Sequence, residues 1–209
     1  GILKEEQFED DKDRLTEFYR EHGYIDFRIN DIKIEYPEEK WMVIKFDVFE
    51  GSQYKIGAVS VKGNQLFPTE EVSKNLTMTS GETFTPSALE KDTGAIRDMY
   101  GTKGYIDTRV DARKQPNIQT GNMDLGIEID EGDQAFIEKV EIRGNTKTKD
   151  KVIRRELAVS PGEVFDMVSV RRSRQRLEGL NYFEKVDTSP EPTDIPNRRN
   201  LVINVEEKN

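Results

Sequence analysis

Three stretches of the chain alternate apolar and polar residues with a period of two, as in a strand that is buried on one face only. Their apolar positions are Met42, Ile44, Phe46 and Val48; Met123, Leu125, Ile127 and Ile129; and Leu201, Ile203 and Val205. Elsewhere apolar residues recur at helical spacing, as in Leu89, Ile96 and Tyr100. The pattern therefore predicts sheets that carry helices on one face and meet water on the other.

The same pattern returns at a fixed offset of 81 residues. The letters GYID stand at 23–26 and again at 104–107, and the pair Gly-Asn stands at 63–64 and at 144–145. Towards the end of the chain the offset falls to 76, because a few residues are missing after the long helix. Internal repetition of this kind defines the structural unit of a chain.

Each repeat is predicted to have the order β-α-α-β-β. The first strand is rich in β-branched residues, and Ile56 and Val59 break its period of two, which indicates a bulge. The expected helix N-caps are Thr69 and Thr148 for the short helices, and Thr85 and Asp166 for the long ones.

The helix pair makes the first two strands antiparallel, and the last strand then runs parallel to the first. The expected strand order is first–third–second, with the second strand at an edge. The predicted fold class is α+β: tandem β-α-α-β-β repeats, each a three-stranded mixed sheet packed on two helices.

Three segments follow from the offset: a first repeat at 1–52, a middle repeat at 53–133 and a last repeat at 134–209. The first repeat has only a long helix and two strands, without the first strand and the short helix. Since a chain rarely leaves half a core exposed, we expect this sequence to be part of a longer protein.

Charge is divided unevenly along the 209 residues, which carry a net charge of −9. From Ala135 onward there are 15 Lys and Arg against 13 Asp and Glu, whereas the first 134 residues have 17 against 28. The acidic part argues against a nucleic-acid backbone as partner. The absence of cysteine excludes disulfides and Cys-based zinc sites.

No arrangement of residues indicates catalysis. His22 is the only histidine, and its place at a helix end is favourable without any chemistry. The acidic clusters lack the spacing of a calcium loop, and no phosphate-binding glycine motif is present. We therefore expect no enzyme activity, no catalytic residue, no cofactor and no metal site.

The segments FIEKVEIRGNTKTKDKVIRREL, RLEGLNYFEKVDTSPEP and LVINVEEKN in the last repeat resemble a POTRA domain of the BamA family, the outer-membrane β-barrel assembly factors. The last repeat is similar to the final POTRA domain before the barrel, the middle repeat to the one before it, and the first repeat to the end of a third. POTRA segments of two-partner-secretion transporters are the alternative. A KH-like nucleic-acid module is a remote one, since no GxxG loop joins the paired helices.

The resemblance implies a periplasmic location on the bacterial outer membrane. It also implies binding partners: unfolded outer-membrane proteins, accessory assembly lipoproteins, a periplasmic chaperone and the protein's own C-terminal barrel. It implies no nucleic-acid partner. Some members of the family contact a lipoprotein through an acidic residue at a place where this chain has Pro161, so that contact does not carry over.

The second strand of each repeat is the predicted client-binding surface, because an unpaired edge accepts an added strand. These edges lie at 27–36, 108–115 and 185–191. The candidate residues are Arg28, Asn30, Ile32, Arg109, Asp111 and Arg113. The alternative interpretation is that their charges only protect the edge from aggregation.

The basic residues of the last repeat form the second candidate surface, for an acidic partner or anionic headgroups. The predicted partner-binding residues are Arg154, Arg155, Glu156 and Glu163. A solvated helix face is the alternative. Finally, Gly23 and Gly104 are expected to end the long helices with positive φ, and the short links between repeats are expected to restrict but not lock orientation.

Overall fold

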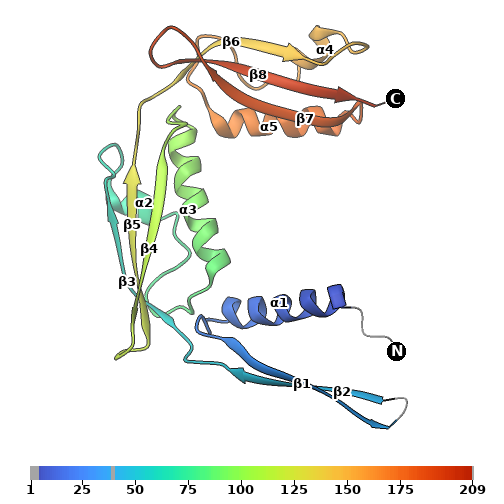
Figure 1. Ribbon diagram of the computed structural model, residues 1–209. Coiled ribbons are helices and arrows are strands. Elements are labelled where there is room, and N and C mark those ends of the chain that lie inside the picture. The colour runs from blue at the N-terminus through green and yellow to red at the C-terminus, as the bar shows by residue number, and fades with distance from the viewer. Residues whose placement is uncertain (1–4, 39–40, 209) are drawn as a thin grey trace. The chain divides into compact units, whose positions relative to one another are not determined.

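A computed structural model of the protein describes residues 5–38 and 41–208 (Figure 1). Contacts between residues divide the chain into two compact units. The first comprises Gly1–Lys62, Ser73–Thr93 and Asp111–Glu128, and the second comprises Gly63–Val72, Gly94–Val110 and Ile129–Asn209. The boundary runs across the middle repeat, so each unit contains one junction between repeats.

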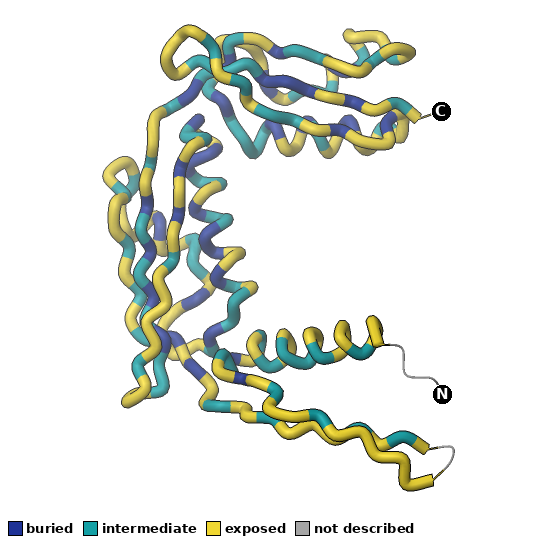
Figure 2. Tube along the Cα trace, viewed as in Figure 1, coloured by how far each residue is buried: buried dark blue, intermediate teal, exposed yellow. Residues whose placement is uncertain are grey.

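The first repeat folds into one helix and one hairpin. Helix α1 (Glu5–Glu21) precedes strand β1 (Arg28–Glu38), which pairs antiparallel with β2 (Trp41–Phe49). The rings of Tyr19 and Phe27 stack at 4.1 Å between centroids and join the helix to the hairpin. No described residue of α1 is buried, so this repeat has a shallow apolar layer (Figure 2).

The middle repeat is a three-stranded sheet with the order β3-β5-β4. Its strands are β3 (Lys55–Lys62), β4 (Arg109–Asn117) and β5 (Asn122–Asp130), and its helices are α2 (Thr69–Ser73) and α3 (Pro86–Gly101). Buried and half-buried residues alternate along β5, as the period of two predicts (Figure 2).

The last repeat has the same plan, with the order β6-β8-β7. Its strands are β6 (Phe136–Arg143), β7 (Phe183–Pro192) and β8 (Arg198–Glu207), and its helices are α4 (Asp150–Arg154) and α5 (Met167–Gly179). None of the helices in the described part of the chain has the length and apolar character needed to cross a membrane.

The predicted topology is confirmed. β3 is parallel to β5 and β6 is parallel to β8, so in the middle and last repeats the last strand is central and the second strand is at an edge. The bulge is confirmed as well: the register shifts between Ile56 and Val59 and again between Ile137 and Val140. In the middle repeat, the carboxylate of Asp124 accepts a hydrogen bond from the bulged N–H of Ala58 at 2.7 Å.

Two of the four expected helix N-caps are confirmed. Asp166 accepts hydrogen bonds from the N–H groups of the first turn of α5, and the Thr85 hydroxyl accepts one from Ala88 N–H at 3.3 Å. Thr148 and Thr69 are wrong predictions, because the residue before α4 is Lys149 and α2 already begins at Thr69. The backbone N–H of Thr148 donates to the carboxylate of Glu207, which holds the loop that precedes α4.

Gly144 marks a close approach between the loop after β6 and strand β8. Its φ is +88°, and a Cβ there would overlap the carbonyl oxygen of Val205. Gly63 stands in the same relation to Ile129 in the middle repeat. Gly162 also has a positive φ, +86°, but has no atom within 4 Å of a Cβ position.

This contrast predicts two different costs for the same substitution. Gly162→Ala should lower the free energy of unfolding of the last repeat by about 1 kcal/mol, the strain of a left-handed residue with a Cβ. Gly144→Ala should cost roughly 3 kcal/mol or more, because β8 must also move. Urea unfolding, with hydrogen exchange of the β8 amides, measures both, and equal costs would contradict the proposed close approach.

Candidate functional site: sheet edges, a basic groove and the repeat junctions

Strands β4 and β7 are free along one side. Among the described strands, β4 has β5 as its only neighbour in its sheet, and β7 has only β8. The opposite edges are partly closed, because Lys55 forms an isolated bridge with Thr83, and Phe136 forms one with Val164. The edges at 108–115 and 185–191 are thus present as predicted, but whether they bind a client is a separate question.

The candidate side chains on β4 lie in water and do not form a pocket. Arg109, Asp111 and Arg113 are all exposed, and Arg113 pairs with Glu128 on β5 at 2.9 Å. Exposed pairs of this kind contribute at most about 1 kcal/mol. What this edge offers a partner is therefore its backbone, with side chains that set charge and solubility.

The candidate residues of the first repeat lie on β1, which within residues 5–38 and 41–208 has β2 as its only partner strand. The guanidinium of Arg28 lies 4.2 Å from the centre of the Phe49 ring and donates to the side-chain oxygen of Asn30 at 3.2 Å. Ile32 is half-buried and pairs with Phe46. Arg28 and Asn30 contact each other, whereas Ile32 packs inward.

Proline limits the usable length of both free edges. Pro116 follows seven residues of β4, and Pro190 follows seven residues of β7. A proline has no N–H to donate and is tolerated in a sheet mainly at an edge. Each edge can therefore accept only a short added strand.

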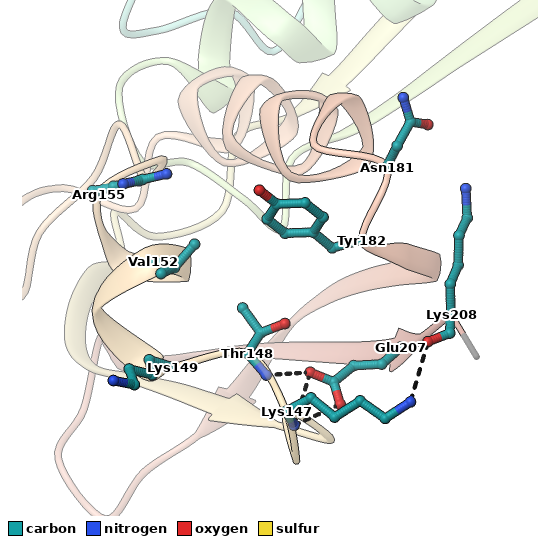
Figure 3. Close-up of a pocket in the computed structure, with 9 residues that line it drawn as sticks. All are labelled: Lys147, Thr148, Lys149, Val152, Arg155, Asn181, Tyr182, Glu207 and Lys208. Carbon is teal, nitrogen blue, oxygen red and sulfur yellow. Dashed lines mark hydrogen bonds between the residues drawn. The ribbon is translucent and has the colours of Figure 1, made fainter.

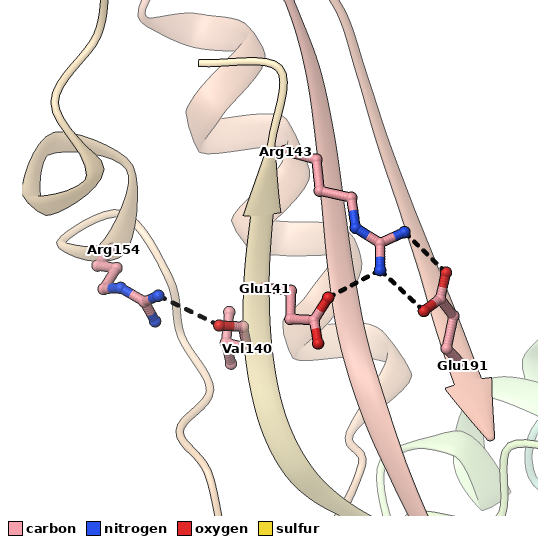
Figure 4. A network of polar contacts seen from close by, with 5 residues as sticks. All are labelled: Val140, Glu141, Arg143, Arg154 and Glu191. Atoms are coloured by element: carbon pink, nitrogen blue, oxygen red, sulfur yellow. Dashed lines mark hydrogen bonds and ion pairs between the residues drawn. The ribbon is translucent and has the colours of Figure 1, made fainter. Parts of the chain in front are cut away.

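Arg154 has a structural role in the last repeat. Its Nε donates to Asp150 at 2.7 Å, and its Nη2 donates to the carbonyl oxygen of Val140 at 3.2 Å (Figure 4). The side chain thus ties α4 to β6. Glu163 is similarly engaged, since it accepts a hydrogen bond from Ser160 N–H at 2.9 Å.

Arg155 is exposed and Glu156 is half-buried. Arg155 pairs with Glu156 at 3.3 Å, and 63% of the Arg155 side chain is exposed. The four predicted partner-binding residues are therefore not brought together as one site. Arg155 instead lines a groove of about 570 Å³ (Figure 3).

This basic groove lies on one side of the last repeat and has an apolar floor with a cationic rim. Its lining residues are Lys147, Thr148, Lys149, Val152, Arg155, Asn181, Tyr182, Glu207 and Lys208. Tyr182 is 51% exposed, so the groove presents an aromatic face beside four cations. Four cations around one groove suit an anionic partner.

Glu207 is the one acid of the basic groove, and backbone groups surround its carboxylate. It accepts hydrogen bonds from the hydroxyl of Thr146 at 2.7 Å and from the N–H groups of Lys147 and Thr148 at 2.8 and 2.6 Å. These bonds, the Thr146 hydroxyl first, lower the pKa of Glu207 to about 2. The carboxylate is therefore committed to holding the loop.

The GYID segments form the junctions between repeats, a role that the repeat pattern did not predict. The carbonyl oxygen of Gly23 accepts a hydrogen bond from Tyr54 N–H at 2.9 Å, and that of Gly104 accepts one from Ala135 N–H at 2.8 Å. Both glycines have a φ of +88°, as expected at a helix end. The tight fit at the junction adds a second reason for glycine, because a Cβ on Gly104 would lie 2.8 Å from the carbonyl oxygen of Ala135.

Further contacts repeat at both junctions. The side-chain amide of Gln53 donates to the backbone carbonyl oxygen of His22 at 2.9 Å. That of Gln134 donates to the backbone carbonyl oxygen of the equivalent Lys103 at 2.8 Å. The isoleucine of each GYID packs on the core of the next repeat: Ile25 on the core that contains Ile56, and Ile106 on the core that contains Ile137.

Ion pairs strengthen the second junction. Arg171 on α5 makes two hydrogen bonds with Asp98 on α3, at 2.8 and 2.9 Å, and lowers the pKa of that acid. Arg199 donates to Asp107 at 2.8 Å. These contacts restrict the second junction. The sequence signal for the two junctions was the repetition of Gln and Ile at offset 81.

No metal site is found among the described residues, since no three His, Asp or Glu side chains come together there. Nδ1 of His22 lies 2.7 Å from the carbonyl oxygen of Phe18, to which it donates. Asp92 is a buried acid, but it accepts hydrogen bonds from the N–H groups of Thr77 and Met78. Both titratable groups have structural roles.

Comparison with known proteins identifies the repeat. The family model described as POTRA, surface antigen variable number repeat, matches residues 1–51, 54–132 and 135–208. The chain belongs to the POTRA family. The predicted resemblance is confirmed, and the mixed three-stranded sheets are those of POTRA repeats.

Relatives with the same repeats are outer-membrane assembly factors. The chain is 32% identical to outer membrane protein assembly factor BamA of Neisseria meningitidis over 99% of this chain and 26% of the relative, and 30% identical to BamA of Nitratidesulfovibrio vulgaris over 100% and 27%. It thus spans about a quarter of the length of these relatives.

Solved structures share the fold. The crystal structure of Haemophilus influenzae BamA POTRA3-5 matches with a TM-score of 0.79 at 23% identity, over 99% of this chain and 83% of that one. BamA from Haemophilus ducreyi lacking POTRA domains 1-3 matches with a TM-score of 0.63 at 21% identity, over 75% and 30%. These two matches support the POTRA fold.

Each POTRA repeat carries a glutamate at the end of its last strand. Glu50 accepts a hydrogen bond from the Tyr19 hydroxyl at 2.8 Å, and Glu131 accepts one from Tyr100 at 2.7 Å. Burial, together with this bond to Glu131, raises the pKa of Tyr100, which therefore stays a donor. The last repeat has no tyrosine at that position, and Glu207 bonds only to the loop after β6.

The lowered pKa of Glu207 predicts acid sensitivity. Its contribution to the stability of the last POTRA repeat is complete above its ordinary pKa of 4.5 and is lost as the pH falls towards about 2. Glu207→Gln should therefore have a lower Tm than the unchanged protein at pH 7, and the two values should converge near pH 2. Thermal unfolding across this pH range measures the difference.

Glu206→Gln is the matched control, because it removes the same charge from the neighbouring position of the same strand. A Tm difference at Glu207 that stays constant from pH 7 to pH 2 would contradict the role of its ionised carboxylate.

Proposed function

We propose that this chain is the periplasmic POTRA segment of an outer-membrane protein assembly factor. Its role is to bind unfolded outer-membrane proteins and pass them to a membrane barrel. The observation that carries the proposal is the free edge of β4 and of β7 in sheets that are otherwise complete. The similarity to proteins named BamA supports the same role.

An added strand explains how one surface could bind many clients. Unfolded outer-membrane proteins share β-strand character rather than a common sequence. Main-chain hydrogen bonds to an edge require an extended backbone and little else. The exposed side chains of Arg109, Asp111 and Arg113 do not obstruct the edge, and they discourage pairing between copies of the protein.

We propose three functional segments, at 1–52, 53–133 and 134–209, with the last nearest to the barrel. The basic groove of the last repeat is the proposed contact for an accessory lipoprotein or for the periplasmic turns of the barrel. Its cationic rim and exposed Tyr182 support an acidic partner. A periplasmic chaperone that delivers clients is a further proposed partner.

The proposed activity is binding and not chemical catalysis. The two acids with lowered pKa values have structural roles: Glu207 holds a loop and Asp98 holds a junction. No nucleic-acid role is proposed, because the chain has a net charge of −9.

Edge binding predicts a main-chain signature. A seven-residue peptide of alternating valine and threonine should shift the amide resonances of β4 and β7 in the labelled chain. The same peptide with N-methyl groups on alternate residues cannot donate along one side and should bind at least tenfold more weakly. Titration followed by two-dimensional NMR measures both, and shifts confined to the helices would refute edge binding.

The basic groove predicts a separation between binding and stability. Arg155→Glu should weaken binding of an accessory lipoprotein at least tenfold with little change in Tm, because Arg155 makes only an exposed ion pair. Arg154→Glu should lower the Tm, because it removes the bonds to Asp150 and Val140. Calorimetric titration and thermal unfolding test the pair. Unchanged lipoprotein affinity in Arg155→Glu would count against the proposed contact.

A further inference from the structure

The middle repeat contains a second groove, here called the β3 groove, between β3 and the segment after α2. It measures about 590 Å³. The lining residues are Gly57, Ala58, Val59, Ser73, Leu76, Met78, Thr79 and Ser80. None of them is charged, and they lie along the edge of β3 that faces away from β5. The β3 groove is therefore separate from the free edge of β4.

The last repeat provides a direct comparison at the same place. Val140 pairs with Leu201 in the register in which Val59 pairs with Leu125, so the two valines are equivalent. By the offset of 81, Ser73 at the end of α2 corresponds to Arg154 at the end of α4.

Arg154 closes this region in the last repeat. Its side chain crosses from α4 to β6, and its guanidinium donates to the Val140 carbonyl at 3.2 Å (Figure 4). Val140 is 7% exposed, whereas Val59 is only half-buried. Ser73 is too short to cross the same distance, and this explains why the β3 groove is open.

The walls of the β3 groove are held in place without an occupant. Asp92 accepts hydrogen bonds from the N–H groups of Thr77 and Met78 and fixes the segment that forms one wall. On the other wall, Asp124 holds the bulge through Ala58 N–H. A preformed groove costs a partner little ordering of the protein.

The geometry of the last repeat indicates what fits. An arginine has an apolar stem that covers Val59 and Leu76, and its planar guanidinium reaches a backbone carbonyl. Charge supports the same occupant. The middle repeat has 9 Lys and Arg against 13 Asp and Glu, whereas the last repeat has 15 against 13.

We propose that the β3 groove of the middle repeat binds an arginine side chain of a partner protein, which takes the position that Arg154 has in the last repeat. The partner adds the side chain that this repeat lacks. The contact recognises a side chain, so it differs from strand addition at β4 and can succeed or fail independently of it.

A short peptide tests the proposal without engaging a strand edge. The probe is acetyl-Gly-Arg-Gly-amide, and its control has citrulline, which is neutral and of nearly the same shape, in place of arginine. The arginine peptide should shift the amides of Val59, Leu76 and Ser80 in the labelled chain. The citrulline peptide should bind at least tenfold more weakly, because it loses the charge-assisted bond.

A double variant fills the β3 groove with an arginine of the chain itself. Thr69→Asp with Ser73→Arg rebuilds the Asp150–Arg154 pair at the equivalent positions and should abolish the shifts. Thr69→Asp with Gln65→Arg has the same net charge but leaves the β3 groove open, so it should bind the arginine peptide like the unchanged protein.

Three results would overturn the proposal: equal binding of the two peptides, shifts outside the β3 groove, or full binding of the arginine peptide by the variant that combines Thr69→Asp with Ser73→Arg. Single Ser73→Ala covers the case in which the double variant does not fold, since it should keep the groove open and retain binding. Loss of binding in Ser73→Ala would equally contradict an open, side-chain-accepting groove.

Discussion

The parallel pairing between the first and the last strand of the middle and last repeats is the interaction on which the rest of the structure depends. It places β5 and β8 at the centres of their sheets, with hydrogen bonds on both sides. Parallel neighbours need a crossover, and the helix pair in that crossover covers one face. The second strand then has a single neighbour. One choice of pairing thus creates both the core and the free edge.

In the middle and last repeats, two features hold the loop after the first strand against the last strand. One is the close approach at Gly63 and Gly144, and the other is the glutamate at the end of the last strand. What varies between repeats is how the glutamate is used: Glu131 bonds a tyrosine and a loop N–H, whereas Glu207 bonds only the loop. The bulge varies too. Asp124 accepts from the bulged backbone, but the side-chain oxygen of Asn200, at the equivalent position, is buried and has no partner in the described part of the chain.

Local pattern and repetition were enough to predict the strand order, the bulge and the N-caps of the long helices α3 and α5, because these follow from periodicity and backbone chemistry. The Thr148 cap was wrong because Glu207, about sixty residues away in the sequence, holds the backbone of the loop that contains Thr148, and α4 begins only after Lys149. The sequence also did not distinguish the role of Arg154 from that of Arg155. Two adjacent basic residues are equivalent in a sequence pattern, and the difference arises only because Arg154 on α4 reaches a carbonyl oxygen on β6. The junction role of GYID depended on contacts between repeats, which a pattern within one repeat does not contain.

The proposed edge binding has a quantitative consequence for the tandem arrangement. An added strand along seven residues makes only a few main-chain hydrogen bonds, each with a net contribution of about 1 kcal/mol, and it must offset the ordering of a flexible client. One edge bounded by proline is therefore a weak site. Two edges within one chain raise the effective concentration of the second contact, which increases the overall affinity without strengthening either edge. Weak single contacts allow release, and repetition keeps the client nearby. A short edge suits the proposed transfer of a client to a membrane barrel, because a longer edge would bind the client more tightly and delay its release.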